Sequence, residues 1–309
     1  MFSAWELILQ QFINGLILGS FYALVALGYS MVYGIIKLFN FAHGDIYMTG
    51  AFACLLVFNL ISGAVPGWPG VICSILAAMC MTAAVGFLTQ RFAYRPMLNA
   101  PRLSLMITAI GVSLILYNSV MVMTSSRPFF FHSGLDNAAG ISFGNISITY
   151  IQIVMLSISA AAMIGLTLFI GRTMLGKAMR AISLDRDTCS LMGVNVRKVI
   201  GITFAIGSAL AAVASGLYCI YYGNVQYNMG YIFGIKAFTA AVIGGIGSIP
   251  GAMLGGLLLG LLEALGTQLL TSLGVSGSAW KDAFAFGLLI MILIFRPNGL
   301  MGKTVVERM

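Results

Sequence analysis

The residues best suited to chemistry lie in one short polar stretch, "NFAHGD", at residues 40–45. A histidine two residues from an aspartate, His43 and Asp45, is a pairing that general acid–base catalysis uses. Catalysis needs further partners, and the sequence supplies none: it contains no HExxH motif, and the second histidine, His132, is distant. The five cysteines show no CxxC spacing. We therefore expect neither an enzyme nor a site for a metal or cofactor.

Membrane-spanning helices must position this stretch. Of the 309 residues, 60% are apolar and only 8% are charged, whereas soluble domains carry about 25% charged residues. Several runs reach about 20 nearly uncharged residues, the length that crosses roughly 30 Å of hydrocarbon. The sequence predicts an all-α, polytopic membrane protein, with residues 1–309 forming a single transmembrane domain.

The apolar runs predict eight or nine transmembrane segments. The first run is long enough for two shorter pieces, and the seventh either crosses or is re-entrant. Glycines and Pro250 in "GGIGSIPGA" predict broken helices, which are tolerated at membrane depth only where protein or a water-filled cavity covers the freed backbone. The runs fall at about 7–36, 45–63, 68–90, 103–124, 149–171, 199–222, 235–248, 251–272 and 280–296.

The basic residues predict the topology. Loop 91–102 carries three arginines and no acid, loop 172–198 carries six basic and two acidic residues, and the tail from Arg296 carries three and one. Stretch 124–149 holds only one basic and one acidic residue, Arg127 and Asp136. The positive-inside rule places the first three, and so the C-terminus, in the cytoplasm, and 124–149 outside. The net charge of +8 then indicates orientation against an anionic leaflet rather than nucleic-acid binding.

Loop 172–198 has the pattern of an ordered element. Its sequence predicts one short helix at about Gly176 to Leu184 and a second that Asp185 caps and that ends at Gly193. Two interpretations follow: a basic anchor on the membrane, or a docking element for a cytoplasmic partner. An apolar side comprises Ala178, Met179, Ile182, Leu191 and Met192, and a basic side Arg180, Arg186 and Arg197.

Three charged residues interrupt the apolar runs: Asp45, Lys236 and Glu263. A charge at the bilayer centre costs at least about 2.5 kcal/mol, so such residues are functional candidates. The structural alternatives are that Lys236 reaches an interface and that Glu263 pairs with a helical neighbour.

Small residues suggest close packing and a weak internal repeat. Glycines four apart let helix backbones approach closely, as in the sets Gly247, Gly251, Gly255 and Gly256, Gly260. The repeat is a faint match between two parts of the chain, and chance matches of small residues explain it equally well. A shift of 188 positions (207 minus 19) aligns Gly19, Ser20, Ala23, Val25, Ala26, Gly28 and Tyr33 with Gly207, Ser208, Ala211, Val213, Ala214, Gly216 and Tyr221.

Three blocks together carry a family resemblance: "GSFYALVALGYSMVYGIIKLFNFAHGDIYMTGAF", "GKAMRAISLDRDTCSLMGVNV" and "KAFTAAVIGGIGSIPGAMLGGLLLGLLEAL". In this order they resemble the inner-membrane permeases of bacterial branched-chain amino-acid ABC importers, the shorter of the two permease types. The resemblance extends over nearly the whole chain and is weakest in 124–149.

The resemblance implies a function and its partners. The chain would translocate leucine, isoleucine and valine across the inner membrane by alternating access. It would work with a second related permease, two cytoplasmic ATP-binding subunits and a periplasmic solute-binding protein. Related permeases carry urea or short amides, which is one alternative. An ion-coupled secondary transporter using Asp45 or Glu263, and a structural subunit without a path, are others.

The resemblance also assigns residues. Those at the family's ATPase-docking positions are Ala178, Arg180, Ala181, Asp185 and Gly193, within the coupling loop 172–198. Candidates for the substrate pathway or gate are the polar and glycine-rich interruptions: Asn40, His43, Gly44, Asp45, Gly244, Gly245, Gly247, Pro250 and Glu263.

The opening stretch is then a helix break in a transport path. We expect Asp45 to cap a helix that starts at Ile46, Gly44 to permit a sharp bend, and Asn40 and His43 to satisfy broken backbone. A helix N-terminus presents free N–H groups and a positive dipole end. It either meets the substrate carboxylate within the membrane or forms a structural corner near the inner gate.

Overall fold

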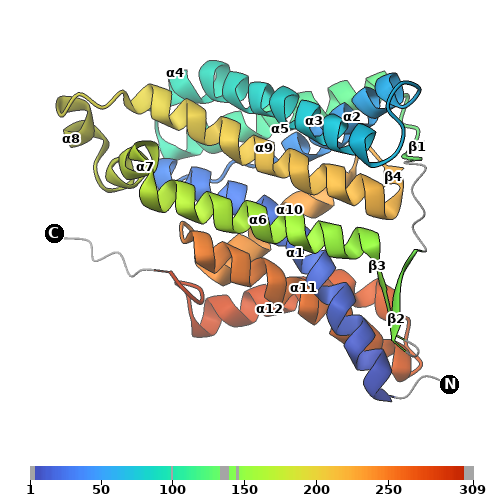
Figure 1. Cartoon of the computed structure of the whole chain (residues 1–309). Coiled ribbons are helices and arrows are strands. Elements are labelled where there is room, and N and C mark those ends of the chain that lie inside the picture. The colour runs from blue at the N-terminus through green and yellow to red at the C-terminus, as the bar shows by residue number, and fades with distance from the viewer. Residues whose placement is uncertain (1–3, 99, 133–138, 144–145, 303–309) are drawn as a thin grey trace.

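The computed structural model describes residues 4–98, 100–132, 139–143 and 146–302, most of which are helical (Figure 1). Among these residues, seven helices are long and apolar enough to cross a membrane. The shorter helices α10 and α12 accompany them, so the predicted count of eight or nine is approximate while the predicted class is confirmed. The long helices are α1 (Ala4–Ile36), α2 (His43–Ile61), α3 (Trp68–Thr89), α5 (Arg102–Met123), α6 (Tyr150–Arg172), α9 (Val196–Tyr222) and α11 (Ile249–Ser272), and the shorter ones α10 (Met229–Gly244) and α12 (Lys281–Phe295).

Short elements connect these helices. Within the part of the chain that the structure describes, two small antiparallel sheets pair β1 with β4 and β2 with β3, a feature that the sequence did not predict. The strands are β1 (Phe129–Phe130), β2 (Gly140–Phe143), β3 (Ile146–Thr149) and β4 (Asn224–Val225), and the short helices are η1 (Gln90–Tyr94, a π-helix), α4 (Arg95–Met97), α7 (Met174–Leu184), α8 (Arg186–Leu191) and η2 (Gly277–Trp280).

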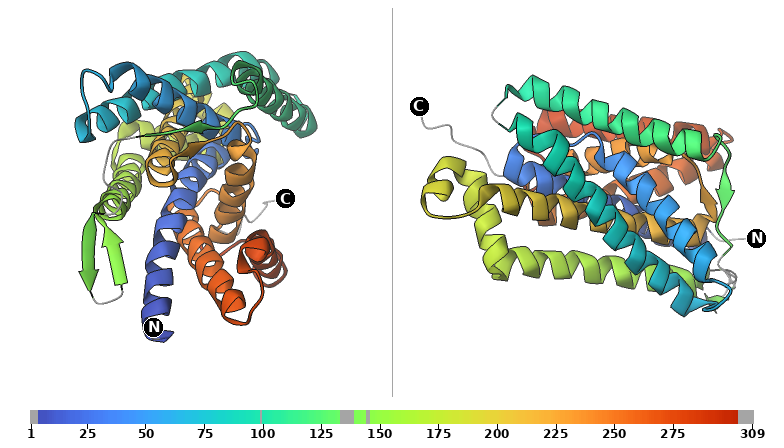
Figure 2. Two further views of the ribbon diagram at one scale, coloured as in Figure 1. Left: turned by 90° about the vertical axis from the view of Figure 1, so that its right-hand side faces the viewer. Right: turned by 90° about the horizontal axis from the view of Figure 1, so that it is seen from above.

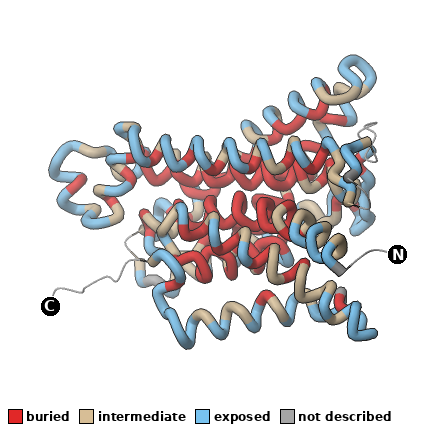
Figure 3. Tube along the Cα trace, turned by 60° about the horizontal axis from the view of Figure 1, so that its bottom comes forward, coloured by how far each residue is buried: buried red, intermediate tan, exposed pale blue. Residues whose placement is uncertain are grey.

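Helix α1 forms the centre of the bundle. It is one continuous helix of 33 residues rather than two pieces. In its most apolar window 89% of the residues are buried, against 11% for α5. Figure 2 shows the other helices around it, and Figure 3 shows burial concentrated in the middle of the bundle and exposure on its outer helices. The exposed apolar faces are those expected to meet lipid or a partner subunit.

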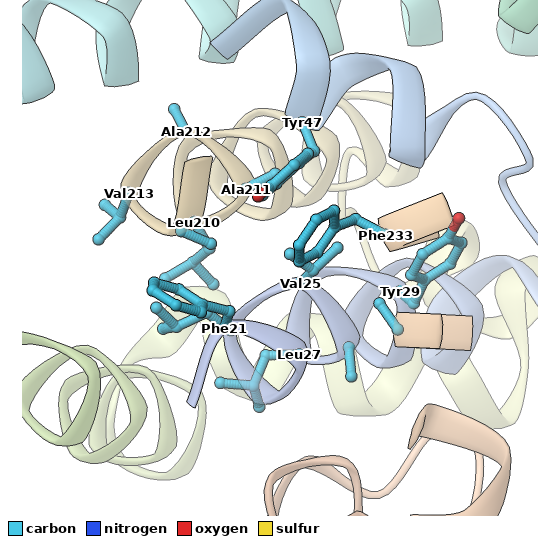
Figure 4. Close-up of a cluster of buried hydrophobic side chains, with 14 of the residues drawn as sticks. Phe21, Val25, Leu27, Tyr29, Tyr47, Leu210, Ala211, Ala212, Val213 and Phe233 are labelled. Atoms are coloured by element: carbon cyan, nitrogen blue, oxygen red, sulfur yellow. The ribbon is translucent and has the colours of Figure 1, made fainter. Parts of the chain in front are cut away.

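Small residues let the central helices approach closely. A Cβ at Gly256 would overlap the backbone of Ala23, and one at Gly260 would overlap that of Gly19, so α11 lies against α1. Gly251 and Gly255 meet the backbone of α10 in the same way. The predicted role of these glycines in helix packing is confirmed. Larger buried side chains from α1, α2, α9 and α10 form a cluster in the core (Figure 4).

The two ends of the bundle differ in charge. At one end, the basic end, lie η1, α7, α8 and the break between α10 and α11, and α7 and α8 protrude there (Figures 1 and 2). At the opposite end β1 pairs with β4. Helix α1 runs towards the basic end and α9 away from it. The 188-position echo therefore relates two antiparallel helices, and the repeat itself stays a prediction.

Candidate functional site

The polar stretch 37–45 forms a corner between α1 and α2. The chain turns at Lys37, whose φ is 59°. Helix α2 begins at His43 and has no side-chain cap. The predicted cap by Asp45 is wrong, because the helix starts three residues earlier than Ile46 and Asp45 lies inside its first turn. The buried Asp45 carboxylate instead accepts a hydrogen bond from the Ser113 hydroxyl of α5.

Asn40 holds the corner together. Its Oδ1 accepts hydrogen bonds from the backbone N–H of Ala42 at 3.2 Å and from the Tyr94 hydroxyl at 2.8 Å. Its carbonyl accepts from the N–H of His43 at 3.0 Å. The expectation that Asn40 satisfies broken backbone is confirmed. The contact with Tyr94 also ties the corner to the π-helix η1, a partner that the sequence did not indicate.

His43 and Gly44 serve close packing. The His43 ring is fully buried edge-on to Tyr29, with centroids 4.7 Å apart, and touches Gly28. No hydrogen bond joins the His43 ring to Asp45, so the two form no acid–base pair. The backbone that the ring faces is that of Val25 within α1, not the freed backbone of the corner. Gly44 makes no bend, since it lies within α2. A Cβ there would collide with the backbone of Gly230 in α10, so the glycine permits the crossing of α2 and α10.

The predicted break lies between α10 and α11. Gly245 and Gly247 adopt positive φ values of 103° and 86°, which residues with a Cβ rarely adopt. Pro250 lies in the first turn of α11, so it starts a helix rather than interrupting one. The freed backbone is covered by protein, as expected: the N–H of Gly247 donates to Oγ of Ser30 at 3.0 Å. The N–H of Met301 donates to the carbonyl of Gly244 at 2.9 Å.

Glu263 lies apart from the corner, in a buried ion pair. Its Oε1 is 2.8 Å from Nζ of Lys236, and its Oε2 accepts a hydrogen bond from the Tyr22 hydroxyl at 2.9 Å. Lys236 also contacts Asp282 at 2.9 Å. The Lys236 side chain is 7% exposed and that of Glu263 1%, whereas that of Asp282 is 64% exposed. Lys236 thus extends from the buried pair to an exposed carboxylate, and its position near a membrane interface stays a prediction. The alternative of a pair with a helical neighbour is confirmed for Glu263.

Loop 172–198 has the predicted helical architecture. The Asp185 side chain accepts hydrogen bonds from the N–H groups of Asp187 and Thr188 at the start of α8. These bonds, with one from the Thr188 hydroxyl, hold the pKa of Asp185 below its ordinary value. Gly193 has a φ of 83° after the helix end. The predicted caps are confirmed because both signals are local.

Two arginines fasten the loop to the bundle. Arg180 donates to the last carbonyls of α6, those of Ile170 and Gly171. Arg186 donates to the carbonyl of Ile36 at 2.6 Å and to that of Ile35 at 3.3 Å, at the end of α1. Carbonyls at a helix C-terminus lack intrahelical donors and carry a partial negative charge, so a guanidinium suits both places.

The apolar side of the loop divides in two. Met179 and Ile182 are buried against the bundle. Leu184, Leu191 and Met192 are 89%, 89% and 81% exposed. Large apolar side chains grouped at the tip of a basic loop indicate an interaction surface. A helix that lies flat on the membrane as an anchor would not need the contacts that Met179 and Ile182 make with the bundle.

A basic groove adjoins the loop. An open cavity of about 800 Å³ lies between η1 and α8. The sequence placed the two loops on one side of the membrane but did not indicate that they share a groove. The cationic lining residues are Arg91, Arg95, Arg186, Arg197 and Lys198.

The structure thus brings the predicted residues together at two places. The five residues predicted to dock an ATPase share the α7–α8 loop. The corner and the break both lie at the basic end, where Gly34 of α1 meets Gly247. Glu263 belongs to a separate cluster. Within the described residues, no group of three or more His, Cys, Asp or Glu side chains is placed to hold a metal ion.

Comparison with known proteins identifies the family. Residues 11–293 match the family described as "Branched-chain amino acid transport system / permease component". The chain is 46% identical to the high-affinity branched-chain amino acid transport system permease protein BraD of Pseudomonas aeruginosa, over 97% of both chains. It is 42% identical to the corresponding LivH protein of Escherichia coli, again over 97% of both. The chain therefore belongs to this family of transport permeases, which are not enzymes.

A solved structure is more distantly similar. The structure titled "PsaBC from Streptococcus pneumoniae in complex with Fab" aligns with a TM-score of 0.48 at 16% identity, covering 92% of this chain and 91% of that chain. A likeness at this level supports no statement about the present chain.

Proposed function

We propose that this chain is the permease subunit of an ABC importer that carries leucine, isoleucine and valine across a bacterial inner membrane by alternating access. The observation that carries the proposal is the match to permeases named for branched-chain amino acid transport, at 42–46% identity over 97% of the chain. The geometry supports it through an ordered loop with an exposed apolar tip.

Four kinds of partner complete the transporter. The tip of the coupling loop docks on the pair of cytoplasmic ATP-binding subunits. The C-terminus then lies in the cytoplasm as well. A second related permease, identical or different, covers part of the exposed helix surface. A periplasmic solute-binding protein delivers the amino acid, and the lipid bilayer covers the rest.

The loop contacts supply a route for coupling. When the ATP-binding subunits close on ATP, they push on α7 and α8. Arg180 and Arg186 pass this displacement to the C-terminal ends of α6 and α1. Because α1 is the central helix, its displacement changes the access of the path. A ligand shifts an equilibrium only through contacts that differ between the states, and a loop fastened to two helices provides them.

The ion-coupled alternative has less support. The ion-coupled hypothesis rests on two carboxylates, Asp45 and Glu263, whereas the family match over residues 11–293 is to permease components of a transport system. The separating experiment is uptake into proteoliposomes holding the complete complex, with ATP inside, binding protein outside and an ionophore present. Uptake that needs internal ATP and survives collapse of ion gradients supports the importer. Gradient-driven leucine uptake by the chain alone would refute it, and preferential uptake of urea would reassign the substrate.

A further inference from the structure

A charged cavity lies at the end of the molecule opposite the coupling loop. It is open, has a volume of about 360 Å³, and includes Asn224 of β4 in its wall. Helices α1, α9, α10 and α11, the connection between β4 and α10 (Gln226 and Asn228), and Lys281 at the start of α12 contribute the rest. The volume falls within the range of about 300–1,000 Å³ typical of small-molecule sites. We call it the Lys236 cavity, after the lysine in its wall.

Two charges in this wall are almost fully buried. Lys236 and Glu263 pair at 2.8 Å, and their side chains are 7% and 1% exposed. At the rim, Asp282 lies 2.9 Å from Lys236, and Nζ of Lys281 lies 4.0 Å from Glu263. The cluster therefore combines two cations with two anions and has no net charge.

Stability alone does not explain such a pair. Replacing a buried ion pair by apolar residues of similar volume is often neutral or stabilising. Ionisable residues within membrane helices are costly, face a bundle interior or a cavity, and mark transport pathways. The pair faces a cavity here, so a ligand that uses both charges is the simpler explanation.

The wall matches an α-amino acid zwitterion with an apolar side chain. The ammonium groups of Lys236 and Lys281 suit a carboxylate, and the carboxylate of Glu263 suits an ammonium group. Leu18, Ile232 and Phe233 supply apolar wall. A zwitterion adds no net charge to a neutral cluster, whereas an ion with a single charge would leave one partner uncompensated.

An aromatic pair adjoins the cavity wall. Phe233 stacks on Tyr47 with centroids 5.1 Å apart, and Tyr47 is fully buried (Figure 4). The Tyr47 hydroxyl has no hydrogen-bond partner. A ligand in the cavity would thus contact Phe233, and the buried Tyr47 ring lies behind it.

We propose that the Lys236 cavity binds the amino and carboxylate groups of the transported amino acid after its release from the binding protein. This inference rests on the proposed function and adds a site in the permease itself. The membrane part then discriminates zwitterions from molecules with one charged group or none.

Ligand binding to the permease complex in nanodiscs tests the proposal. The complex includes the ATP-binding subunits but neither ATP nor the binding protein, and saturation-transfer NMR reports binding. The probes are L-leucine, 4-methylpentanoate, which lacks the ammonium group, 3-methylbutylamine, which lacks the carboxylate, and urea. Because each analogue loses one charge-assisted interaction, we expect it to bind at least about tenfold more weakly than leucine. Equal binding of leucine and either analogue, or stronger binding of urea, overturns the proposal.

Variants separate a ligand site from a structural ion pair. The double variant K236M/E263M keeps apolar packing, and we expect it to lose at least about tenfold in leucine affinity. The partly exposed Lys281 gives a second variant, K281Q, that leaves the buried pair intact and is expected to weaken leucine binding about threefold. R127Q, which removes an exposed cation, is the matched control and should bind like the wild type. Wild-type affinity in K281Q and in a correctly folded double variant refutes the site.

The two proposals fail differently. If the wild-type complex with its binding protein carries no leucine on ATP, the proposed function is wrong. If it carries leucine, and K281Q and the correctly folded double variant both bind leucine as the wild type does, only the cavity proposal is wrong.

Discussion

The contact between Arg186 and the end of α1 gives the sharpest prediction about coupling. R186Q removes a guanidinium that donates to the Ile36 carbonyl at 2.6 Å and to the Ile35 carbonyl at 3.3 Å. A hydrogen bond from a charged group contributes about 1.5–3 kcal/mol, and a cation at a helix C-terminus adds about 0.3–1 kcal/mol. Arg186 is half-buried, so water compensates in part and the lower part of this range applies.

A loss of about 2 kcal/mol raises the ratio of released to fastened loop about 30-fold. Two measurements follow this change. Spin labels at Ser190 in α8 and Lys37 after α1 should give a broader distance distribution in R186Q. In proteoliposomes, leucine transported per ATP hydrolysed should fall, while ATP hydrolysis itself persists.

The controls separate position from charge. R197Q removes the same charge from an exposed arginine of the same loop, and we expect wild-type coupling. R186K keeps the charge but loses the planar fork, and we expect an intermediate effect. The reasoning is refuted if R186Q leaves both the distance distribution and the ratio of leucine to ATP unchanged, or if R197Q lowers that ratio equally.

Three further predictions concern the loop and the corner. Gly193→Val should strain a backbone with φ of 83° by at least about 1–2 kcal/mol, and so impair ATP-driven uptake but not membrane insertion. The control Gly193→Asn should retain uptake. Normal uptake by the valine variant would show that the loop is only an anchor. Gly44→Ala should push α2 away from the Gly230 backbone, destabilise the folded protein by about 1–3 kcal/mol and lower its thermal unfolding temperature in detergent. The control Gly63→Ala adds a Cβ in open space and should leave that temperature unchanged. Equal unfolding temperatures of the two variants would contradict the close crossing of α2 and α10. Because the pKa of Asp185 is lowered, its helix cap is fully present above the ordinary pKa of about 3.9 and is lost as the pH falls through the lower folded pKa. Amide-exchange protection of Thr188, corrected for intrinsic rates, should show this loss in the wild type and not in Asp185→Asn. Loss of protection near neutral pH would disprove this assignment.

Local signals in the sequence determined much of this protein. Length and composition of the apolar runs established the membrane-helix class and most helix limits, because the bilayer sets the length of a span. The caps of α8 at Asp185 and Gly193 and the break before Pro250 were equally predictable. Each depends on backbone conformation within a few residues, which the residue types themselves restrict.

Only the tertiary structure decided which polar groups meet. The sequence predicted that Asp45 caps its own helix, but its partner Ser113 is 68 residues away. Arg186 likewise reaches a carbonyl 150 residues before it. Membrane helices are apolar on their lipid-facing and core-facing sides alike, so the sequence carries no stripe that reveals the inner face. The pairing of Lys236 with Glu263 therefore became visible only once close glycine contacts had set how α10 and α11 lie together.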